Sequence, residues 1–279
     1  MDLRQEPVDH VLTTVEQRLD MTLDRTTLVR KRRTVGARTD RGSWVRVERR
    51  PWPRARQQGW AGTEAAAALT GVAMPHWTGS VSWQELTDGT IWRADETELL
   101  PSRPVSTAVV ATDPQLPDAW WYALNTSLNN LASQHTARVA TPDTEIITQQ
   151  LVDRVIRVAF PTATNTRVKT WRPAHADLNW ANVTGPPFCI FDWEDWGMAP
   201  RGLDSAALLA ASLGVPALAD RVRHERQADL QSRDGTVMRL FALAKIAGPN
   251  AQPNDPRVDP ARGEAAELIR ALQQSDGLQ

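Results

Sequence analysis

The sequence predicts an α+β fold in which a small antiparallel sheet precedes a larger helical part. Short β-prone runs separated by turn residues occupy the first part of the chain, a pattern typical of hairpins. From Pro117 onward the apolar residues recur at helical spacing instead. A third observation is the polar run between Ala174 and Asp204, which no other segment matches and which holds the best candidate functional site.

The first predicted element is a short amphipathic helix over residues 8–19. Four apolar residues recur there at helical spacing, namely Val8, Leu12, Val15 and Leu19. Three strands should follow in an antiparallel pattern, with a turn at Asp40-Arg41-Gly42 before the last of them. They are predicted at Thr27–Arg33, Thr34–Arg38 and Trp44–Glu48.

The rest of the N-terminal part should complete this sheet. An alanine-rich stretch bounded by glycines predicts a helix at Thr63–Leu69. Two further strands are expected at Val81–Leu86 and Thr90–Asp95. The Pro-rich passage that follows contains a β-prone segment, Ser106–Thr112, which we interpret as a last strand and hinge.

The two parts should meet near Asp113, which gives a first domain of residues 1–112 and a second of residues 113–279. The second domain is predicted to be mainly helical, and Asp118 is the expected N-cap of its first helix. Its helices are predicted at 118–139, Thr144–Phe160, Ser205–Leu213, Pro216–Gln231, Thr236–Ala247 and Glu264–Gln273.

The formal net charge of −1 conceals a basic N-terminal part. Between Arg25 and Arg56, twelve Lys or Arg residues stand against only Asp40 and Glu48. Such a stripe can bind nucleic acid, an acidic peptide or nucleotide phosphates, although it more often forms the solvated faces of strands. No nucleic-acid-binding motif accompanies it, so a nucleic-acid partner is not favoured.

The single cysteine, Cys189, lies inside an apolar strand, which excludes a disulfide framework and does not suggest a catalytic thiol. The N-terminal segment lacks the apolar core of a signal peptide. No apolar run reaches the roughly 18 residues of a membrane span. We therefore expect a soluble, cytoplasmic protein without a membrane partner.

The polar segment has a defined spacing. His175, Asp177 and Asn182 form the pattern His-x-Asp-x-x-x-x-Asn, and Asp192 follows at the end of the apolar run 188–191. Taken singly, each Asp or Asn could serve only turn and cap chemistry, because these residues favour such positions. Taken together, they provide a carboxylate that can act as a base and two oxygen donors that can hold a metal.

A hairpin should bring those two oxygen donors to one face. Gly185-Pro186-Pro187 is a turn signal between two β-prone segments. With the turn centred there, Asn182 lies opposite Ile190, and Asp192, two residues on, points to the same face. Both side chains offer the hard oxygen ligands that Mg²⁺ prefers. Asp177, on the preceding loop, can accept the proton of an attacking hydroxyl.

This segment resembles the catalytic segment of the aminoglycoside phosphotransferase and choline kinase branch of the protein-kinase-like superfamily. Those proteins carry an H-G-D-x-x-x-x-N loop, a hairpin and a D-W-E or D-x-E step, matched here by residues 175–182 and 192–194. The resemblance implies a bilobal protein-kinase-like fold, with an antiparallel-sheet N-lobe that covers the nucleotide and a larger helical C-lobe. Ala176 stands where the family has Gly.

Carried over to this chain, the resemblance implies a role for each residue of the segment. Asp177 would be the catalytic base, and His175 would support its loop. Asn182 and Asp192 would bind the metal and, through it, the nucleotide. Asp204 matches a structural Asp that in the family follows the metal site and ties down the next helix.

The resemblance is thinner in the N-lobe. No G-x-G-x-x-G loop precedes residue 45, where the only glycines are Gly36 and Gly42. Where kinases place a phosphate-pairing Lys, this chain offers Arg46, which could hold a phosphate or could be an exposed strand residue. Glu64 is the candidate for the helix carboxylate that pairs with this cation and supports cofactor binding. It could instead complement the dipole of its own helix.

The implied function is an ATP- and Mg²⁺-dependent phosphotransferase, a kinase that moves the γ-phosphate to a hydroxyl of a small molecule or of a Ser/Thr peptide. Residues 193–196, Trp-Glu-Asp-Trp, should stand at the mouth of the acceptor pocket, either contacting the acceptor or packing. The missing Gly-rich loop and strand Lys favour an alternative, a pseudokinase that holds nucleotide or a peptide without turnover. The sequence does not determine which molecule is the phosphate acceptor.

Overall fold

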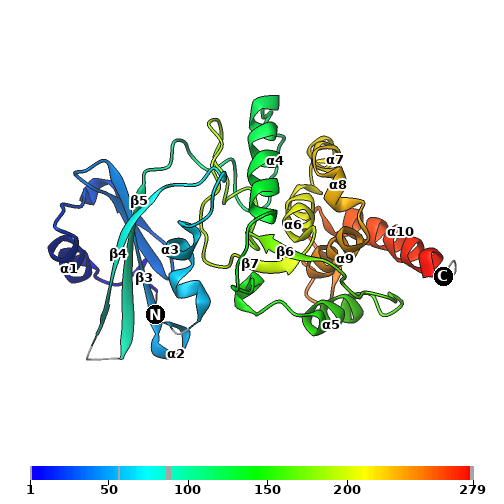
Figure 1. Ribbon diagram of the computed structural model, residues 1–279, viewed down its shortest axis with the longest axis horizontal. Coiled ribbons are helices and arrows are strands. Elements are labelled where there is room, and N and C mark those ends of the chain that lie inside the picture. Colours follow the sequence, from blue (N-terminus) through cyan, green and yellow to red (C-terminus); the bar gives the residue numbers. More distant parts are fainter. Residues whose placement is uncertain (1, 56, 86–88, 277–279) are drawn as a thin grey trace. The chain divides into compact units, whose positions relative to one another are not determined.

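The computed structural model describes residues 2–55, 57–85 and 89–276, and the chain forms two compact units (Figure 1). The main division falls after Pro101, whereas the expected boundary lay after Thr112. The first unit consists of Met1–Leu69, Met74–Pro101 and Phe191–Glu194, and the second of Thr70–Ala73, Ser102–Ile190 and Asp195–Gln279. The predicted α+β class, an antiparallel sheet followed by helices, is confirmed.

The first unit is built on a five-stranded antiparallel sheet with the strand order β1-β2-β3-β5-β4. Its strands are β1 (Val29–Arg30), β2 (Thr34–Arg38), β3 (Ser43–Pro51), β4 (Trp77–Gln84) and β5 (Thr90–Glu98). The first predicted strand is shortened because Arg25–Thr27 form a 3-10 turn capped by the Asp24 side chain. Leu86, the expected end of the fourth strand, lies outside the described residues.

Alternation along β3 gives the sheet two different faces. Val45 and Val47 lie on the apolar face, which packs against α1 (Asp9–Leu19), the helix predicted at residues 8–19 (Figure 1). The opposite face carries three charged residues of β3, and two of these three pair in register with charged residues of β5. They are Arg46, Glu48 and Arg50 on β3, and Arg93 and Asp95 on β5.

Two short helices complete the first unit, α2 (Trp52–Ala55) and α3 (Gly62–Ala66). The latter is shorter than the predicted Thr63–Leu69. A Cβ on Gly62 would lie 2.4 Å from the carbonyl oxygen of Trp193 and 2.6 Å from Cα of Glu194. Only glycine permits this approach, so α3 begins directly against the segment 191–194.

The second unit is mainly helical, with one two-stranded antiparallel sheet of β6 (Trp171–Ala174) and β7 (Gly197–Pro200). Its helices are α4 (Asp118–Ala132), α5 (Gln149–Ala159), α6 (Leu203–Ser212), α7 (Pro216–Glu225), α8 (Gln227–Leu230), α9 (Arg233–Ala247) and α10 (Val258–Asp276). No helix among the described residues has the length and apolar character needed to span a membrane.

Helix ends in the second unit differ from the predicted ones for local reasons. The predicted helix Pro216–Gln231 is interrupted at Arg226 and forms α7 and α8. Pro117, rather than Asp118, is the N-cap of α4, and Asp118 lies in the first turn, where its charge complements the helix dipole. Helix α5 begins only after Thr148, whose side chain caps it by accepting from the Leu151 N–H.

The strand predicted at Ser106–Thr112 is wrong, because this segment is irregular. Its backbone N–H groups bond to other parts of the second unit instead of a sheet edge. Ser106 donates to the Trp180 carbonyl at 3.2 Å, and Val110 donates to the Ala211 carbonyl at 3.4 Å. β-Propensity alone could not reveal these partners, since they are distant in sequence.

Candidate active site

Asp204, in the first turn of α6, holds the loop that begins at His175. Its carboxylate is buried and accepts the backbone N–H of His175 at 2.7 Å and that of Ala176 at 2.8 Å. Burial raises the pKa of the Asp204 carboxyl, against the opposing effects of His175 and of the two N–H groups. Asp204 therefore has a structural role, as predicted. The segment that its carboxylate binds is the loop at His175 and Ala176.

Ala176 has a left-handed backbone, with φ of 71°. An L-residue with a Cβ pays for this conformation, whereas glycine adopts it freely. The resemblance places a Gly at this position, and the observed φ supplies the physical reason. The change to Ala therefore costs conformational energy, although the two bonds to Asp204 hold the loop in place.

Asp177 is exposed, and its carboxylate is oriented by two amide side chains from the same loop. Asn179 donates to Oδ1 at 3.1 Å, and Asn182 donates to Oδ2 at 2.8 Å. Both amides also donate to the Asp177 carbonyl, at 3.0 and 2.8 Å. Sequence reasoning missed Asn179, although the spacing Asp-x-Asn is a signal for local side-chain bonding of this kind.

The side-chain nitrogen of Asn182 is held by hydrogen bonds to Asp177. Because the nitrogen donates to Asp177, the oxygen is the atom that could coordinate a metal. Trp180 fixes this end of the loop, since its ring is fully buried, stacks on Trp120 at 5.9 Å and donates to Ser212 at 3.0 Å. The predicted loop thus has rigid supports on both sides of Asp177.

The hairpin after this loop differs from the predicted one. Only Val183 and Ile190 form a bridge, with the Thr184 N–H donating to the Cys189 carbonyl at 2.9 Å. The expected register, with Asn182 opposite Ile190, is wrong by one residue. A slip of one residue exchanges the faces of a strand, so the predicted placement of Asn182 and Asp192 on one hairpin face is wrong.

Asp192 belongs to the first unit, in the segment 191–194. Its backbone is left-handed, with φ of 68°, a conformation that Asp tolerates better than most residues. One carboxylate oxygen lies 3.9 Å from a guanidinium nitrogen of Arg46. The structure therefore places Asp192 beside the charged face of the sheet.

Arg46 is the centre of a cluster of charges on that face. Its guanidinium contacts the Glu194 carboxylate and lies 3.6 Å from Glu48. Burial disfavours the charge of Arg46, but the carboxylates of Glu194, Asp192 and Glu48 outweigh this effect and raise its pKa. Arg46 is thus a partly buried, ion-paired residue, whereas the alternative interpretation was an exposed strand residue.

Glu194 joins two arginines of β3. Its second oxygen accepts from Arg50 at 2.6 Å, and Arg50 also donates to Glu48 at 2.6 Å. The Arg50 guanidinium lies over the Trp60 ring, 5.6 Å from its centroid. Period-two spacing of charges in β3 could have indicated this cluster from the sequence, but the partner of Arg46 and Arg50 is distant in the chain.

The expected pairing of Glu64 with Arg46 is wrong. Glu64 accepts from Arg93 at 2.9 Å. Arg93 also donates to Asp95 at 2.7 Å, and the Trp77 indole donates to Asp95 at 3.0 Å. Because Arg93 lies on β5, opposite Glu48, α3 meets a cation on a different strand from the one that the resemblance indicated.

Carboxylates outnumber guanidinium groups in this part of the described structure. The ion pairs join three arginines, Arg46, Arg50 and Arg93, to five acids, Glu48, Glu64, Asp95, Asp192 and Glu194. Burial raises the pKa of the Glu194 carboxyl, against the pull of Arg46, and the nearby carboxylates of Glu48 and Asp192 add to the rise. The cluster therefore has an excess of negative charge.

The two glycines before residue 45 have structural explanations. A Cβ at Gly36 would lie 2.5 Å from the Trp44 ring, so Gly36 makes room for that side chain. Gly42 has φ of 76° and forms the tight turn before β3. Neither belongs to a phosphate-covering loop of the G-x-G-x-x-G kind.

The residues expected at the mouth of an acceptor pocket have other contacts. Trp193 and Trp196 are buried, which agrees with packing. Glu194 binds the β3 arginines, and Asp195 accepts from the Thr141 hydroxyl at 2.5 Å. The alternative of structural packing thus describes this tetrapeptide better than direct contact with an acceptor.

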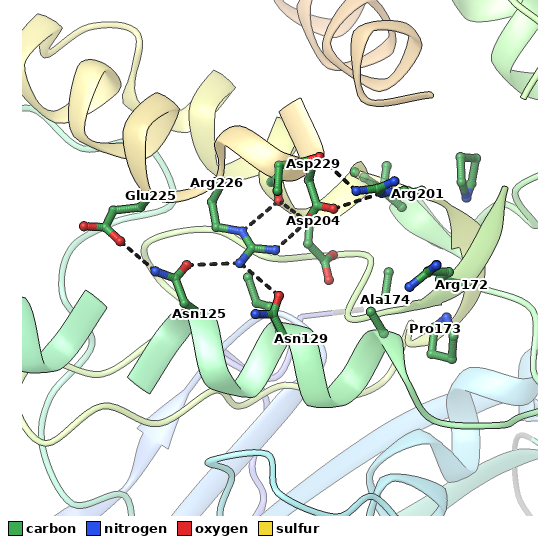
Figure 2. Close-up of a pocket in the computed structure, with 17 residues that line it drawn as sticks. Asn125, Asn129, Arg172, Pro173, Ala174, Arg201, Asp204, Glu225, Arg226 and Asp229 are labelled. Carbon is green, nitrogen blue, oxygen red and sulfur yellow. Dashed lines mark hydrogen bonds and ion pairs between the residues drawn. The ribbon is translucent and has the colours of Figure 1, made fainter. Parts of the chain in front are cut away.

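The second unit contains a polar cavity of about 420 Å³ beside Asp204 (Figure 2). Arg226 lies at its wall, where it donates to Asn125 of α4 at 3.0 Å and to Ser205 at 3.1 Å. Asp177 and Asn182 are not among the described residues that line it. The cavity therefore adjoins the loop anchor Asp204, and at its wall Asp229 is ion-paired with Arg201 and Arg226.

These features define a kinase-like α+β fold, in which an antiparallel-sheet unit is followed by a helical unit that carries a His-x-Asp-x-x-x-x-Asn loop. The fold predicted from the sequence resemblance is thereby confirmed. Solved structures with this fold include kinases of small molecules.

Three such structures cover most of this chain. An amicoumacin kinase solved with AMP-PNP and Ca²⁺ has a TM-score of 0.58 at 12% identity, covering 94% of each chain. APH(2")-IIia, solved with GDP and kanamycin, has a TM-score of 0.56 at 13% identity, covering 98% of this chain and 100% of its own. APH(2")-IIa, solved with streptomycin and ATP, has a TM-score of 0.53 at 13% identity, covering 88% and 93%.

The sequence comparisons add no closer relationship. No family model matches the chain, and no curated protein sequence matches it either. The likeness to the solved kinases lies in the fold.

Proposed function

We propose that this chain is an ATP- and Mg²⁺-dependent phosphotransferase that moves the γ-phosphate to a hydroxyl of a small molecule. The observation that carries the proposal is the orientation of the exposed Asp177 carboxylate by Asn179 and Asn182. A base must be held at a fixed angle toward an acceptor hydroxyl, and a rigid loop lowers the entropic cost of that alignment. Asp177 would accept the hydroxyl proton as the acceptor oxygen attacks phosphorus.

The proposed metal ligands are the amide oxygen of Asn182 and the carboxylate of Asp192. Both are hard oxygen donors, which fits Mg²⁺. Within the described ranges, no three His, Cys, Asp and Glu side chains are grouped to hold a metal ion by themselves. This agrees with a Mg²⁺ site in which water and nucleotide phosphates complete the coordination. When bound, the cation would neutralise charge on the phosphates.

Arg46 is the proposed phosphate-binding residue of the sheet. Its side chain is 31% exposed, so it is not sealed from a ligand. A guanidinium can hold a phosphate with two parallel hydrogen bonds. The excess of carboxylates around it supports the need for a divalent cation, because a bare polyphosphate would be repelled.

A small-molecule acceptor is favoured over a Ser/Thr peptide by the fold neighbours, whose structures contain kanamycin, streptomycin or amicoumacin. Glu194 and Asp195 have partners within the protein. They therefore offer no ready acidic surface for a polycationic aminoglycoside. The acceptor class is accordingly a hydroxylated small molecule, which the test must sample broadly.

The test is ADP formation from MgATP in the presence of kanamycin, streptomycin, amicoumacin and Ser/Thr peptides. We expect acceptor-dependent ADP formation with at least one small molecule. The Asp192→Ala variant should bind MgATP at least tenfold more weakly, because it loses a metal ligand. Wild-type protein that binds no MgATP at all would contradict the proposal.

A second candidate is a kinase-fold protein that holds nucleotide without turnover. It is favoured by the glycines before residue 45, which serve packing and a tight turn. MgATP binding by the wild type, without transfer to any acceptor or to water, would support this candidate over the enzyme.

A further inference from the structure

Arg46 can serve a phosphate only if its guanidinium is held in one orientation, and Glu194 makes its closest ion pair. The Glu194 side chain is 14% exposed, compared with 31% for Arg46. The carboxylate therefore lies deeper than the arginine that it contacts. This arrangement holds the guanidinium from its buried side, while the Arg46 side chain stays partly exposed.

Glu194 is itself held in place. Its other oxygen accepts from Arg50 at 2.6 Å, and Arg50 is only 10% exposed. Arg50 is in turn fixed by two bonds to Glu48, at 2.6 and 3.1 Å. Because charged hydrogen bonds in buried surroundings are strong and directional, the position of Glu194 is set by the strand that also carries Arg46.

Glu64 has a different environment. Its side chain is 46% exposed, and it forms an ion pair with Arg93 on β5. Water competes for the exposed Glu64 carboxylate, which weakens its hold on a partner. Glu64 is therefore poorly suited to fix a guanidinium on β3.

We propose that Glu194 is the positioning residue of Arg46, with the role that the sequence resemblance assigned to Glu64. The inference rests on the proposed function, in which Arg46 binds nucleotide phosphate. One tripeptide, residues 192–194, would then have two roles. Asp192 would bind the metal, and Glu194 would orient Arg46. The buried Trp193 and the close contact of its backbone with Gly62 hold this tripeptide against α3.

The test compares Glu194→Gln, Glu194→Asp and the matched control Glu64→Gln, using calorimetric binding of MgATP and of adenosine. We expect Glu194→Gln to weaken MgATP binding about tenfold and adenosine binding by less than twofold, because only the phosphate contact depends on Arg46. Glu194→Asp should retain part of the MgATP affinity. Glu64→Gln should stay within twofold of the wild type for both ligands.

Chemical denaturation of each variant shows that it is folded, and Glu194→Asp carries the test if Glu194→Gln does not fold. Equal weakening of MgATP and adenosine binding would indicate a merely structural role and overturn the inference. Unchanged MgATP binding in the Glu194 variants would also overturn it, with the proposed function left standing. A wild-type chain that binds no MgATP would overturn both.

Discussion

Single residues in the loop before Asn182 combine strain with firm anchoring. Ala176 has φ of 71°, and its N–H and that of His175 both bond to the buried Asp204. Backbone strain is often kept at functional sites where surrounding bonds determine the conformation. Here the strain lies directly before Asp177, so the loop is held in shape for the carboxylate that follows.

Replacing Ala176 by Gly should stabilise the protein. The left-handed conformation costs Ala roughly 1–2 kcal/mol, which Gly would avoid. Gly also makes the unfolded chain more flexible, and this offsets about 0.4–1 kcal/mol of the stabilisation. The net expectation is an increase of up to about 1 kcal/mol in the free energy of unfolding, measured by urea denaturation. Ala266→Gly, at an exposed position in α10, is the control and should destabilise by about 1 kcal/mol. A loss of stability in Ala176→Gly equal to that control would contradict the account.

At the scale of elements, α3 and the segment 191–194 depend on a close backbone approach. Gly62→Ala would place a Cβ 2.4 Å from the Trp193 carbonyl oxygen, so one of the two elements must shift. We expect a loss of about 1–3 kcal/mol in the free energy of unfolding and weaker MgATP binding. Gly79→Ala is the matched control, because nothing lies within 4 Å of the added Cβ. Thermal unfolding and calorimetry measure both effects, and equal behaviour of the two variants would contradict the proposed contact.

Local sequence patterns predicted the helices and strands better than they predicted which strands and side chains pair with one another. The spacing of Val8, Leu12 and Val15 identified α1, and the turn at Gly42 placed the start of β3. The register of the short hairpin could not be derived, because a turn with two prolines allows neighbouring registers and only one bridge forms. Hydrophobic periodicity and turn residues depend on neighbours in the sequence. They reveal little about contacts between side chains that are distant in the sequence.

The candidate site shows the same division between local and distant information. The spacing in the sequence indicates Asp177, Asn182 and Asp192 as candidates, and the orientation of Asp177 by Asn182 is a local contact. The pairing of Glu64 with Arg93, and of Arg46 with Glu194, depends on strand order and on a chain segment more than a hundred residues away. Such contacts follow from tertiary packing, which no spacing rule in the sequence encodes.

At the scale of the whole molecule, the charge balance should make the proposed nucleotide binding dependent on a divalent cation. The acids around Arg46 would repel the polyphosphate of ATP unless a cation accompanies it. We expect calorimetric ATP affinity to fall at least tenfold when Mg²⁺ is replaced by EDTA at constant ionic strength. Adenosine, which lacks phosphates, is the control and should bind equally in both buffers. Equal ATP affinity with and without Mg²⁺ would contradict this part of the account.

The most direct test of the central claim, that Asp177 acts as the base of a phosphotransferase, is a single-turnover measurement at saturating MgATP with the acceptor found in the ADP-formation test. Asp177→Asn keeps the size of the side chain but replaces one acceptor oxygen by an NH₂ donor and cannot accept the proton. Transfer should therefore fall about 10²–10⁴-fold while MgATP affinity changes little. Asn179→Ala, which removes one of the two orienting amides, should reduce the transfer rate to a smaller extent. Transfer by Asp177→Asn at the wild-type rate would contradict the account.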